Sequence, residues 1–377
     1  MATTLPPISD SPEARRYNRI HRRLGIADAA LGLAMLTVLL ATGWTKDLRD
    51  WAHSLAPSNY VLALFYYLFF LNVLGKIMGI GFDLYSFRLE HQYRLSNQRL
   101  RSWAWDEIKG YVLGLILSVI LAQLLYFLIR NATQYWWLIA WAAFMVLFVL
   151  FAQIAPVVLF PIFYSFRPLE DEDLRERLTR LSERAGTRVR GVYEWRLSEK
   201  SKKANAALTG LGNTRRIILS DTLLQSYTPD EIEAVLAHEL GHHVHKHILK
   251  SIVMQAVITF IGFWAVKWVV SWSVIQGWFD SKSDFANLPL IILVTTVMSL
   301  VLMPFLNAYS RMNERQADRY AWKSIPAVMP FISAMTKLAE QNLAEKNPSR
   351  VVEVLFHSHP PISKRILAAE AWGRARA

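Results

Sequence analysis

Residues 110–129 have the sequence GYVLGLILSVILAQLLYFLI, a run without a charged side chain. A helix rises about 1.5 Å per residue, so a run of this length crosses the hydrocarbon core of a bilayer, which is about 30 Å thick. An apolar run this long is typical of a transmembrane helix and not of a helix in a soluble core. The stretch therefore places part of the chain in a membrane.

Similar runs lie on both sides of this stretch, in a chain of 377 residues that is 53% hydrophobic and 19% charged. A typical soluble domain carries about a quarter charged residues. The expected spans are residues 27–44, 60–82, 110–129, 136–164, 251–272 and 288–309. The fourth contains Pro156 and Pro161, so we expect it to bend or to leave the membrane near its end. The sequence predicts a mainly α-helical, multi-pass membrane protein with six spans.

Basic residues indicate the orientation of these spans. Arginines crowd the segment before the first span, and by the positive-inside rule they hold the N-terminus in the cytoplasm. The net charge of +12 follows this topology, so we expect membrane lipids and no nucleic acid as partners. A cleaved secretory signal is the alternative for the N-terminus, but the run lacks a clear cleavage site. We expect a retained anchor in a bacterial inner membrane or in the endoplasmic reticulum membrane.

The topology also divides the chain. The expected parts are a basic cytoplasmic segment 1–26, membrane helices 27–164 with a cytoplasmic loop 83–109, a cytoplasmic region 165–250, two membrane helices in 251–309 and a C-terminal part 310–377. Leucines at helical spacing predict an amphipathic helix between Leu169 and Arg184. Three short strands are expected at Gly191–Leu197, Ala204–Leu208 and Arg216–Leu219. Together they predict a small sheet beside helices.

A helix with a metal-binding pattern begins at residues 228–231. Their sequence, TPDE, combines a Thr N-cap, Pro at the first helical position and Glu three residues after the cap. The helix then carries H-E-x-x-H, which places His238 and His242 on one face, while Glu239 is placed to reach a metal-bound water. The chain has no cysteine, so any metal must be held by His, Asp or Glu. The alternative is a surface helix that carries these residues by chance.

Two histidines leave a catalytic zinc site one protein ligand short. Directly after the last expected span, Glu314 and Asp318 lie one helical turn apart. We expect Glu314 to be the third ligand and Asp318 to accept a hydrogen bond from a ligating imidazole, as partners of metal-bound histidines usually do. The alternative is a solvated charged face at the end of a helix.

Several motifs in a fixed order make the chain resemble the integral-membrane CAAX prenyl endopeptidases, a family of zinc metalloproteases. The motifs are HELGH at 238–242, SRMNERQAD at 310–318, SKKANA at 201–206, HPP at 359–361 with Arg365, and the loop segments 87–91 and 106–109. The resemblance implies a zincin-like protease region at the cytoplasmic side of helices that enclose a water-filled chamber. Relatives are described with seven spans, whereas this sequence predicts six.

The resemblance also implies roles for individual residues. One zinc ion per chain would be bound by His238, His242 and Glu314, with Glu239 as the general base and Asp318 in support. Asn205 and Ala206 would lie on the strand that pairs with the peptide substrate, and the alternative for this strand is a purely structural role. The expected substrate is a peptide or protein, and whether it must be lipidated stays open.

Other polar residues have two interpretations each. His359, beside two prolines, could donate to the developing oxyanion with Arg365, or it could serve in capping or packing while Arg365 pairs with a surface carboxylate. For His243, His245 and His247 we expect a structural role, with a second metal site as the alternative. Lys76 fits a hydrated chamber, whereas Lys267, near a helix end, is expected to reach the membrane surface.

Three other functions are weighed against the prenyl endopeptidase. A metal transporter needs acidic or histidine ligands at membrane depth, and the later spans have none. A binding-only pseudoprotease is disfavoured because every residue of the expected site is present. The alternative left open is a broad-specificity quality-control metalloprotease of the membrane, which shares H-E-x-x-H but has fewer spans.

Overall fold

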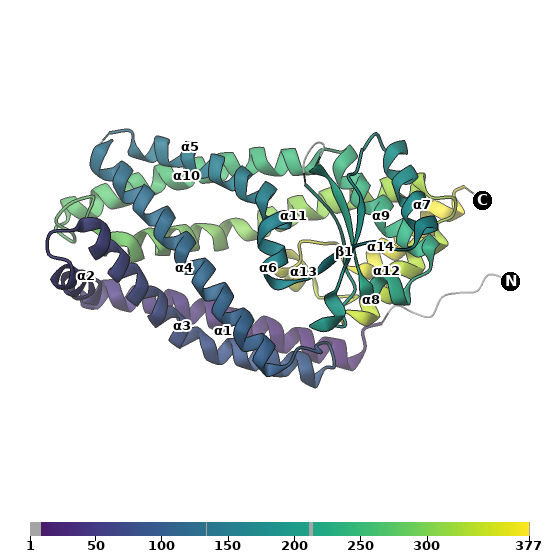
Figure 1. Ribbon diagram of the computed structural model, residues 1–377, viewed down its shortest axis with the longest axis horizontal. Coiled ribbons are helices and arrows are strands. Elements are labelled where there is room, and N and C mark those ends of the chain that lie inside the picture. The colour runs from purple at the N-terminus through teal and green to yellow at the C-terminus, as the bar shows by residue number, and fades with distance from the viewer. Residues whose placement is uncertain (1–8, 133, 211–213, 377) are drawn as a thin grey trace.

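The computed structural model describes residues 9–132, 134–210 and 214–376. Figure 1 shows long helices that extend from one end of an elongated molecule and a small sheet with short helices at the other end. Six helices of the described chain are long and apolar enough to cross a bilayer, which confirms the expected number. The fold is mainly α-helical, as the sequence predicts.

The first long helices are α1 (Pro12–Thr42), α3 (Tyr60–Gln92), α4 (Leu100–Asn131) and α5 (Trp136–Ile154). Side chains cap two of them, because Ser11 accepts a hydrogen bond from the backbone of α1 and Asn59 accepts one from α3. The region 45–59, expected as a plain loop, contains the short helix α2 (Trp44–Leu55). Helix α2 is amphipathic and packs against α3, a pattern that a search for long apolar runs does not detect.

The segment 83–109, predicted as a cytoplasmic loop between two spans, is mostly helical. Helix α3 continues to Gln92 and α4 begins at Leu100, so only residues 93–99 connect them. Acidic residues of both extensions form ion pairs, as Glu90 does with Lys203 and Asp106 does with Lys200. Hydropathy shows where the apolar side chains end, but the backbone hydrogen bonds of a helix can continue through polar residues. Helices α3 and α4 are therefore longer than the expected spans.

The fourth span has the irregularity that its prolines predict. Helix α5 ends at Ile154, a π-helical turn covers Ala155–Leu159, and α6 (Phe160–Phe163) follows. Pro156 has no backbone N–H to donate within this turn. The chain then leaves the helix and enters the first strand.

Four strands form one mixed sheet, β1 (Phe166–Pro168), β2 (Val192–Trp195), β3 (Ala206–Thr209) and β4 (Arg216–Ser220), in the order β1-β2-β4-β3. Strand β2 runs parallel to β4, and the two outer strands are antiparallel to their neighbours. The three expected strands are present, and β1 is a strand that the sequence analysis missed because it has only three residues. Strand β3 lies at an edge of the sheet.

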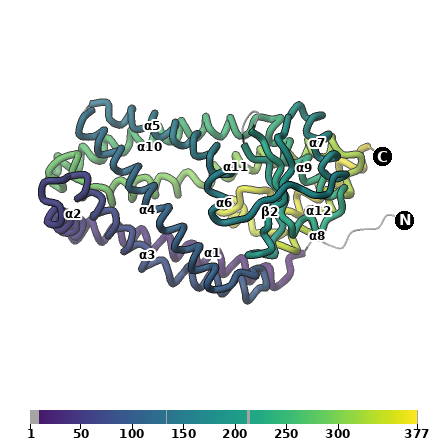
Figure 2. Tube along the Cα trace, viewed as in Figure 1, coloured from purple at the N-terminus to yellow at the C-terminus, as the bar shows by residue number. Residues whose placement is uncertain are grey.

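Short helices cover the sheet and complete the same end of the molecule. They are α7 (Glu172–Arg184), α8 (Asp221–Ser226), α9 (Pro229–Val244), α12 (Met329–Gln341), α13 (Arg350–Phe356) and α14 (Ile362–Arg374). The leucines that predict α7, among them Leu178, are buried in one core with Ile217 and Leu219 of β4. Two further long helices, α10 (His247–Ile275) and α11 (Leu288–Ser324), return to the membrane part. Figure 2 shows α11 extending along the molecule to the sheet end.

The connection between α3 and α4 fastens the membrane helices to the sheet end. Ser96 forms an isolated bridge with Ser201, and the N–H of Lys202 donates to the carbonyl of Leu95. An ion pair of 2.5 Å between Lys200 and Asp106 lies close by. The two ends of the molecule are therefore joined by backbone contacts as well as by charges.

A cavity of about 870 Å³ lies among α1, α3, α4, α5, α10 and α11. Its lining is mostly apolar, and the charged groups include Lys76, which pairs with Asp83 and Glu107 at 2.8 and 2.5 Å. Lys76, which the sequence predicts to face a chamber, thus lies in the wall of this cavity. The ammonium of Lys267 lies 5.4 Å from the ring centre of Trp137, against another helix of the bundle.

Candidate metal centre

The helix that carries H-E-x-x-H is fixed at its N-terminus. The side chain of Thr228 accepts from the N–H of Glu231, and Glu231 accepts from the N–H of Thr228 at 2.8 Å, as a capping box requires. Glu231 also accepts from Ser333 and Lys337 of α12, at 2.6 and 2.7 Å. Burial alone would raise the pKa of Glu231, but Lys337, Ser333 and the Thr228 N–H lower it below its ordinary value. Helix α9 is thereby held against α12.

The close crossing of α9 and α11 depends on one glycine of the HELGH run. A Cβ atom on Gly241 would lie 2.7 Å from the Cα and 2.9 Å from the carbonyl oxygen of Ala317. Ala317 is itself fully buried, so its backbone has no space to retreat. Glycine at this position lets the two helices touch, which brings the acidic residues of α11 to the histidines of α9.

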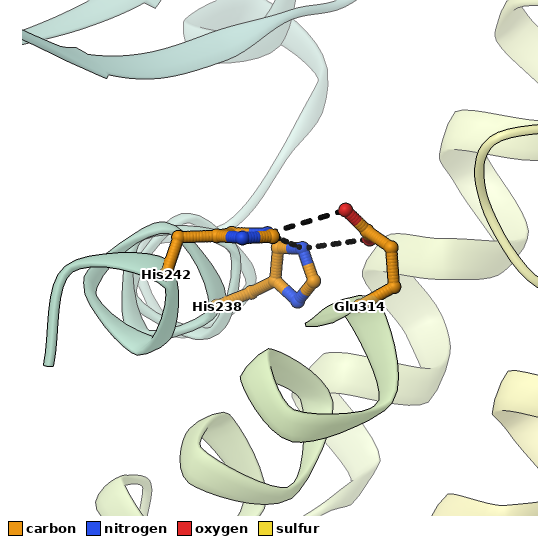
Figure 3. A group of neighbouring side chains, drawn as sticks. All are labelled: His238, His242 and Glu314. Atoms are coloured by element: carbon orange, nitrogen blue, oxygen red, sulfur yellow. Dashed lines mark hydrogen bonds and ion pairs between the residues drawn. The ribbon is translucent and has the colours of Figure 1, made fainter. Parts of the chain in front are cut away.

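Three side chains converge at this crossing (Figure 3). The two Nε2 atoms of His238 and His242 lie 3.3 Å apart. Glu314 places one carboxylate oxygen 3.2 Å from Nε2 of His238 and the other 3.2 Å from Nε2 of His242. Each residue offers a ligand atom within 4.8 Å of the other two. The structure thus brings together the three residues that the sequence analysis expects to bind a metal.

The chemistry of this cluster fits a divalent cation. Glu314 is 4% exposed, yet its Oε2 atom makes no hydrogen bond among the described residues. A buried carboxylate oxygen without a hydrogen bond is costly unless a positive charge compensates it. Two imidazole nitrogens and one carboxylate are a donor set that catalytic zinc sites use. A metal ion held by His238, His242 and Glu314 removes the cost.

The far side of His238 contacts a buried ion pair. Its Nδ1 lies 2.9 Å from Asp318, and Arg365 donates two hydrogen bonds to Asp318, at 2.9 and 2.6 Å. Burial alone would lower the pKa of His238, but Asp318 and Glu314 raise it to about 9 in the metal-free protein. Asp318 therefore lies beside the imidazole of His238, and its supporting role stays a prediction.

Arg365 occupies a buried position in this arrangement. Its side chain is 9% exposed, and one guanidinium nitrogen also lies 3.4 Å from Nδ1 of His238. Burial opposes the charge, yet Asp318 raises the pKa of Arg365 above its ordinary value. The substrate-binding role expected for Arg365 stays a prediction, and its contacts are with residues of the centre.

The far side of His242 contacts a residue that the sequence analysis did not assign to the centre. Nδ1 of His242 lies 3.0 Å from Nδ1 of His247, and Nε2 of His247 lies 3.0 Å from the carboxamide oxygen of Gln316. On one continuous helix His245, seven residues after His238, would return near the same face, so helical spacing does not single out His247. Helix α9 ends at Val244, and Lys246, with a φ of 55°, is the N-cap of α10, whose first residue is His247. This break in the helix turns His247 back toward the centre.

Glu239 lies on α9 beside His238 and is partly buried. Burial raises the pKa of Glu239, while the two neighbouring imidazoles lower it and Glu314 adds a smaller raising effect. The net direction is upward, so this carboxylate holds a proton more readily than an ordinary glutamate. A carboxylate of this kind suits a group that accepts and returns a proton.

The C-terminal segment reaches the same centre. Nε2 of His359 lies 3.3 Å from Glu314, and its side chain is 62% exposed. Arg311 of α11 donates to the carbonyls of Glu353 and His357, which holds this segment over α11. His359 is therefore at the open side of the centre, where an incoming ligand can reach it.

Asn205 and Ala206 lie at the start of the edge strand. The N–H of Asn205 donates to the hydroxyl of Ser220, and Ser220 donates its N–H to the carbonyl of Asn205. Asn205 is exposed, and the outer side of β3 has no strand partner within the described residues. Strand β3 also packs against α9, the helix of the two histidines.

Two family models match the chain and together span most of it. The model described as "Peptidase family M48" matches residues 168–373. The model described as "CAAX prenyl protease N-terminal, five membrane helices" matches residues 9–165. The first match contains every residue of the centre.

Similar proteins come from bacteria and eukaryotes. An "Uncharacterized metalloprotease YhfN" of Bacillus subtilis is 28% identical, over 96% of this chain and 86% of its own length. A "CAAX prenyl protease 1 homolog" of Arabidopsis thaliana is 31% identical over 84% and 75%. The "CAAX prenyl protease 1" of Saccharomyces cerevisiae is 27% identical over 98% and 89%. The crystal structure of S. mikatae Ste24p has a TM-score of 0.85 at 24% identity and covers 98% of this chain and 92% of that one, which shows a shared fold.

Proposed function

Because the chain belongs to peptidase family M48, we propose that His238, His242 and Glu314 bind one zinc ion that serves peptide hydrolysis. The protein is a multi-pass membrane metalloendopeptidase that resembles the CAAX prenyl proteases. One observation carries the zinc proposal, the buried Glu314 carboxylate that faces two imidazole nitrogens at 3.2 Å.

Glu239 is the general base of this proposal. A bound zinc ion supplies a Lewis acid, which polarises a carbonyl and lowers the pKa of water toward 7. Glu239 accepts the proton of the attacking water and then donates it to the leaving amine. The raised pKa of Glu239 supports this exchange, since a weakly basic carboxylate would not hold the proton between the two steps.

Two further groups act on the substrate and on the centre. His359, exposed beside Glu314, donates to the oxyanion that develops on the scissile carbonyl. The contacts of Arg365 support a positioning role, because it reaches the centre through Asp318 and His238 and not through open space. Asp318 in turn fixes the ring of His238.

The edge strand β3 binds the peptide in an extended conformation. Main-chain hydrogen bonds along an unpaired strand edge hold a peptide with little demand on its side chains. Ala206 begins this strand, Asn205 directly precedes it, and β3 packs on the helix of the proposed catalytic residues. A peptide laid along this edge is thereby brought to α9.

The substrate is the C-terminal peptide of a lipidated protein, and the centre faces the cytoplasm. The names of the Arabidopsis and yeast relatives support the substrate class, and the arginines before the first span support the orientation. The large apolar cavity beside the centre's own helix α11 offers space for an alkyl chain. We expect no nucleic-acid partner, since the excess of basic residues is explained by the positive-inside rule.

The test measures zinc content and peptide cleavage together. Purified wild type and Glu239→Gln are assayed with a farnesylated peptide and with the same peptide without its lipid. We expect one zinc per chain in both proteins, and cleavage of the farnesylated peptide by the wild type alone. Equal cleavage of both peptides supports a quality-control protease instead, and wild type that retains zinc without any cleavage contradicts the proposed enzyme.

A further inference from the structure

The two histidines of the centre have different partners behind them. His238 faces the charged pair of Asp318 and Arg365, whereas His242 faces a chain of neutral groups, His247 and then Gln316. His247 is 3% exposed, so its two ring nitrogens bond to His242 and Gln316 and not to bulk water. Which group donates and which accepts in the hydrogen bonds from Gln316 through His247 to His242 is therefore decided by these protein groups.

The direction of the chain follows from its last member. The carboxamide oxygen of Gln316 only accepts, so Nε2 of His247 must carry the proton. A neutral imidazole has one N–H, so Nδ1 of His247 is left as an acceptor, and Nδ1 of His242 must donate to it. The second nitrogen of His242, its Nε2, then carries a lone pair. This nitrogen is the one that faces His238 and Glu314.

We propose that Gln316 and His247 are positioning residues that set the tautomer of His242 and so keep its Nε2 free to bind the metal. The inference rests on the proposed zinc site. The reverse arrangement, with the amide group of Gln316 turned to donate, would place a proton on Nε2 of His242 and block the ligand. Catalytic triads use the same device, in which an acceptor behind a histidine decides which ring nitrogen is free.

Helix α11 thereby controls both histidine ligands. It supplies Glu314 to the metal, Asp318 to His238 and Gln316 to His247. These side chains lie within five residues of one helix, next to the point where Gly241 contacts Ala317. The placement of helix α11 therefore sets the position of the proposed third ligand, Glu314, and the orientation of the two histidines.

The experiment compares Gln316→Met with Gln316→Glu. Methionine keeps the length of the side chain but removes the acceptor, whereas glutamate keeps an acceptor in the same place. Zinc affinity is measured by chelator competition on the purified full chain, and the thermal unfolding temperature is measured with and without zinc. We expect Gln316→Met to bind zinc about 10- to 100-fold more weakly, as loss of a partner behind a metal ligand usually does. Gln316→Glu stays within about threefold of wild type.

Controls separate positioning from folding. Gln123 of α4 donates to the carbonyl of Val61, away from the centre, so Gln123→Met makes the same chemical change and leaves zinc affinity unaltered. A purely structural role for Gln316 would lower the unfolding temperature of the zinc-free protein and leave the affinity unchanged, and that result overturns the inference. Equal loss of affinity in both Gln316 variants also overturns it. Wild type without zinc affinity contradicts the proposed zinc site itself.

Discussion

Two glutamates of the candidate centre differ in their contacts, and we propose different tasks for them. Both oxygens of Glu314 face imidazole nitrogens, which suits the proposed role as a metal ligand. Glu239 makes no hydrogen bond among the described contacts and has a raised pKa, which leaves it available for a proton. A glutamine side chain cannot accept the proton and carries no charge to balance a cation. The same substitution at Glu239 and at Glu314 should therefore have different effects on cleavage and on zinc content.

We expect Glu239→Gln to lower the cleavage rate by about 10²- to 10⁴-fold while zinc content stays at wild-type level, since only the base is lost. Glu314→Gln should lose zinc as well as peptide cleavage, because the third ligand is weakened. The measurements are zinc per chain by elemental analysis and peptide turnover. Zinc loss in Glu239→Gln would argue that this residue is a ligand.

The buried pair of Arg365 and Asp318 predicts a stability effect. Arg365→Met leaves the carboxylate of Asp318 buried without its cation, which typically costs about 3–5 kcal/mol. We expect a lower thermal unfolding temperature in detergent. The double variant Arg365→Met with Asp318→Asn should recover part of the loss, because it removes the unpaired charge. Additive losses in the double variant would show that the two residues act independently.

At the scale of elements, the α9–α11 crossing is the contact that assembles the centre. Gly241→Ala places a methyl group about where the backbone of Ala317 lies, and overpacking of this kind costs about 1–3 kcal/mol. We expect weaker zinc binding together with lower stability, because the helices separate and Glu314 recedes. The matched change Gly25→Ala, on α1 where no atom lies within 4 Å, should alter neither property. Chelator competition measures the zinc affinity, and thermal unfolding measures the stability.

The contact between α9 and α12 depends on an ionised Glu231. Its pKa is lowered in the folded protein, so it contributes stability above its ordinary pKa of 4.5 and loses the contribution as pH falls from there through the lowered folded value. We expect the difference in unfolding temperature between wild type and Glu231→Gln to be largest near pH 7 and to shrink below about pH 4.5. A difference that is constant from pH 7 to pH 4 would contradict this assignment.

At the scale of the whole molecule, one helix joins the cavity to the centre. Leu288 and Ile292 near the start of α11 line the cavity, and Glu314 near its end lies at the metal centre. A substrate with its lipid in the cavity and its peptide at the centre would thus extend along α11. The arrangement predicts that the cavity contributes to substrate choice and not to the hydrolytic step.

Filling the cavity tests this prediction. Gly79 lines the cavity, and a Cβ placed there has no atom within 4 Å, so Gly79→Trp fills space without a clash at its base. We expect kcat/KM for a farnesylated peptide to fall at least tenfold, a loss of about 1.4 kcal/mol, while any residual cleavage of the unlipidated peptide is unchanged. Gly114→Trp, at an exposed position of α4 outside the cavity lining, is the control. Equal losses for both peptides would place the lipid elsewhere.

Much of the fold and part of the centre follow from local patterns in the sequence. The six spans, the capped helix of H-E-x-x-H and three strands depend on residues close together in the chain, whose periodicity and capping are visible without the fold. The helical extensions of α3 and α4 are polar, α2 is short and amphipathic, and β1 has only three residues, so a search for long apolar runs and alternating strands missed them.

The sequence by itself determined that the protein is helical, spans a membrane and presents two histidines and a glutamate on one helix turn. Tertiary structure alone decided that Glu314 meets those histidines, that Arg365 is buried against Asp318, and that His247 rather than His245 supports His242. The reason is physical. Local preferences act over a few residues, whereas these contacts depend on how closely α9 and α11 cross and on the single left-handed residue, Lys246, that redirects the chain.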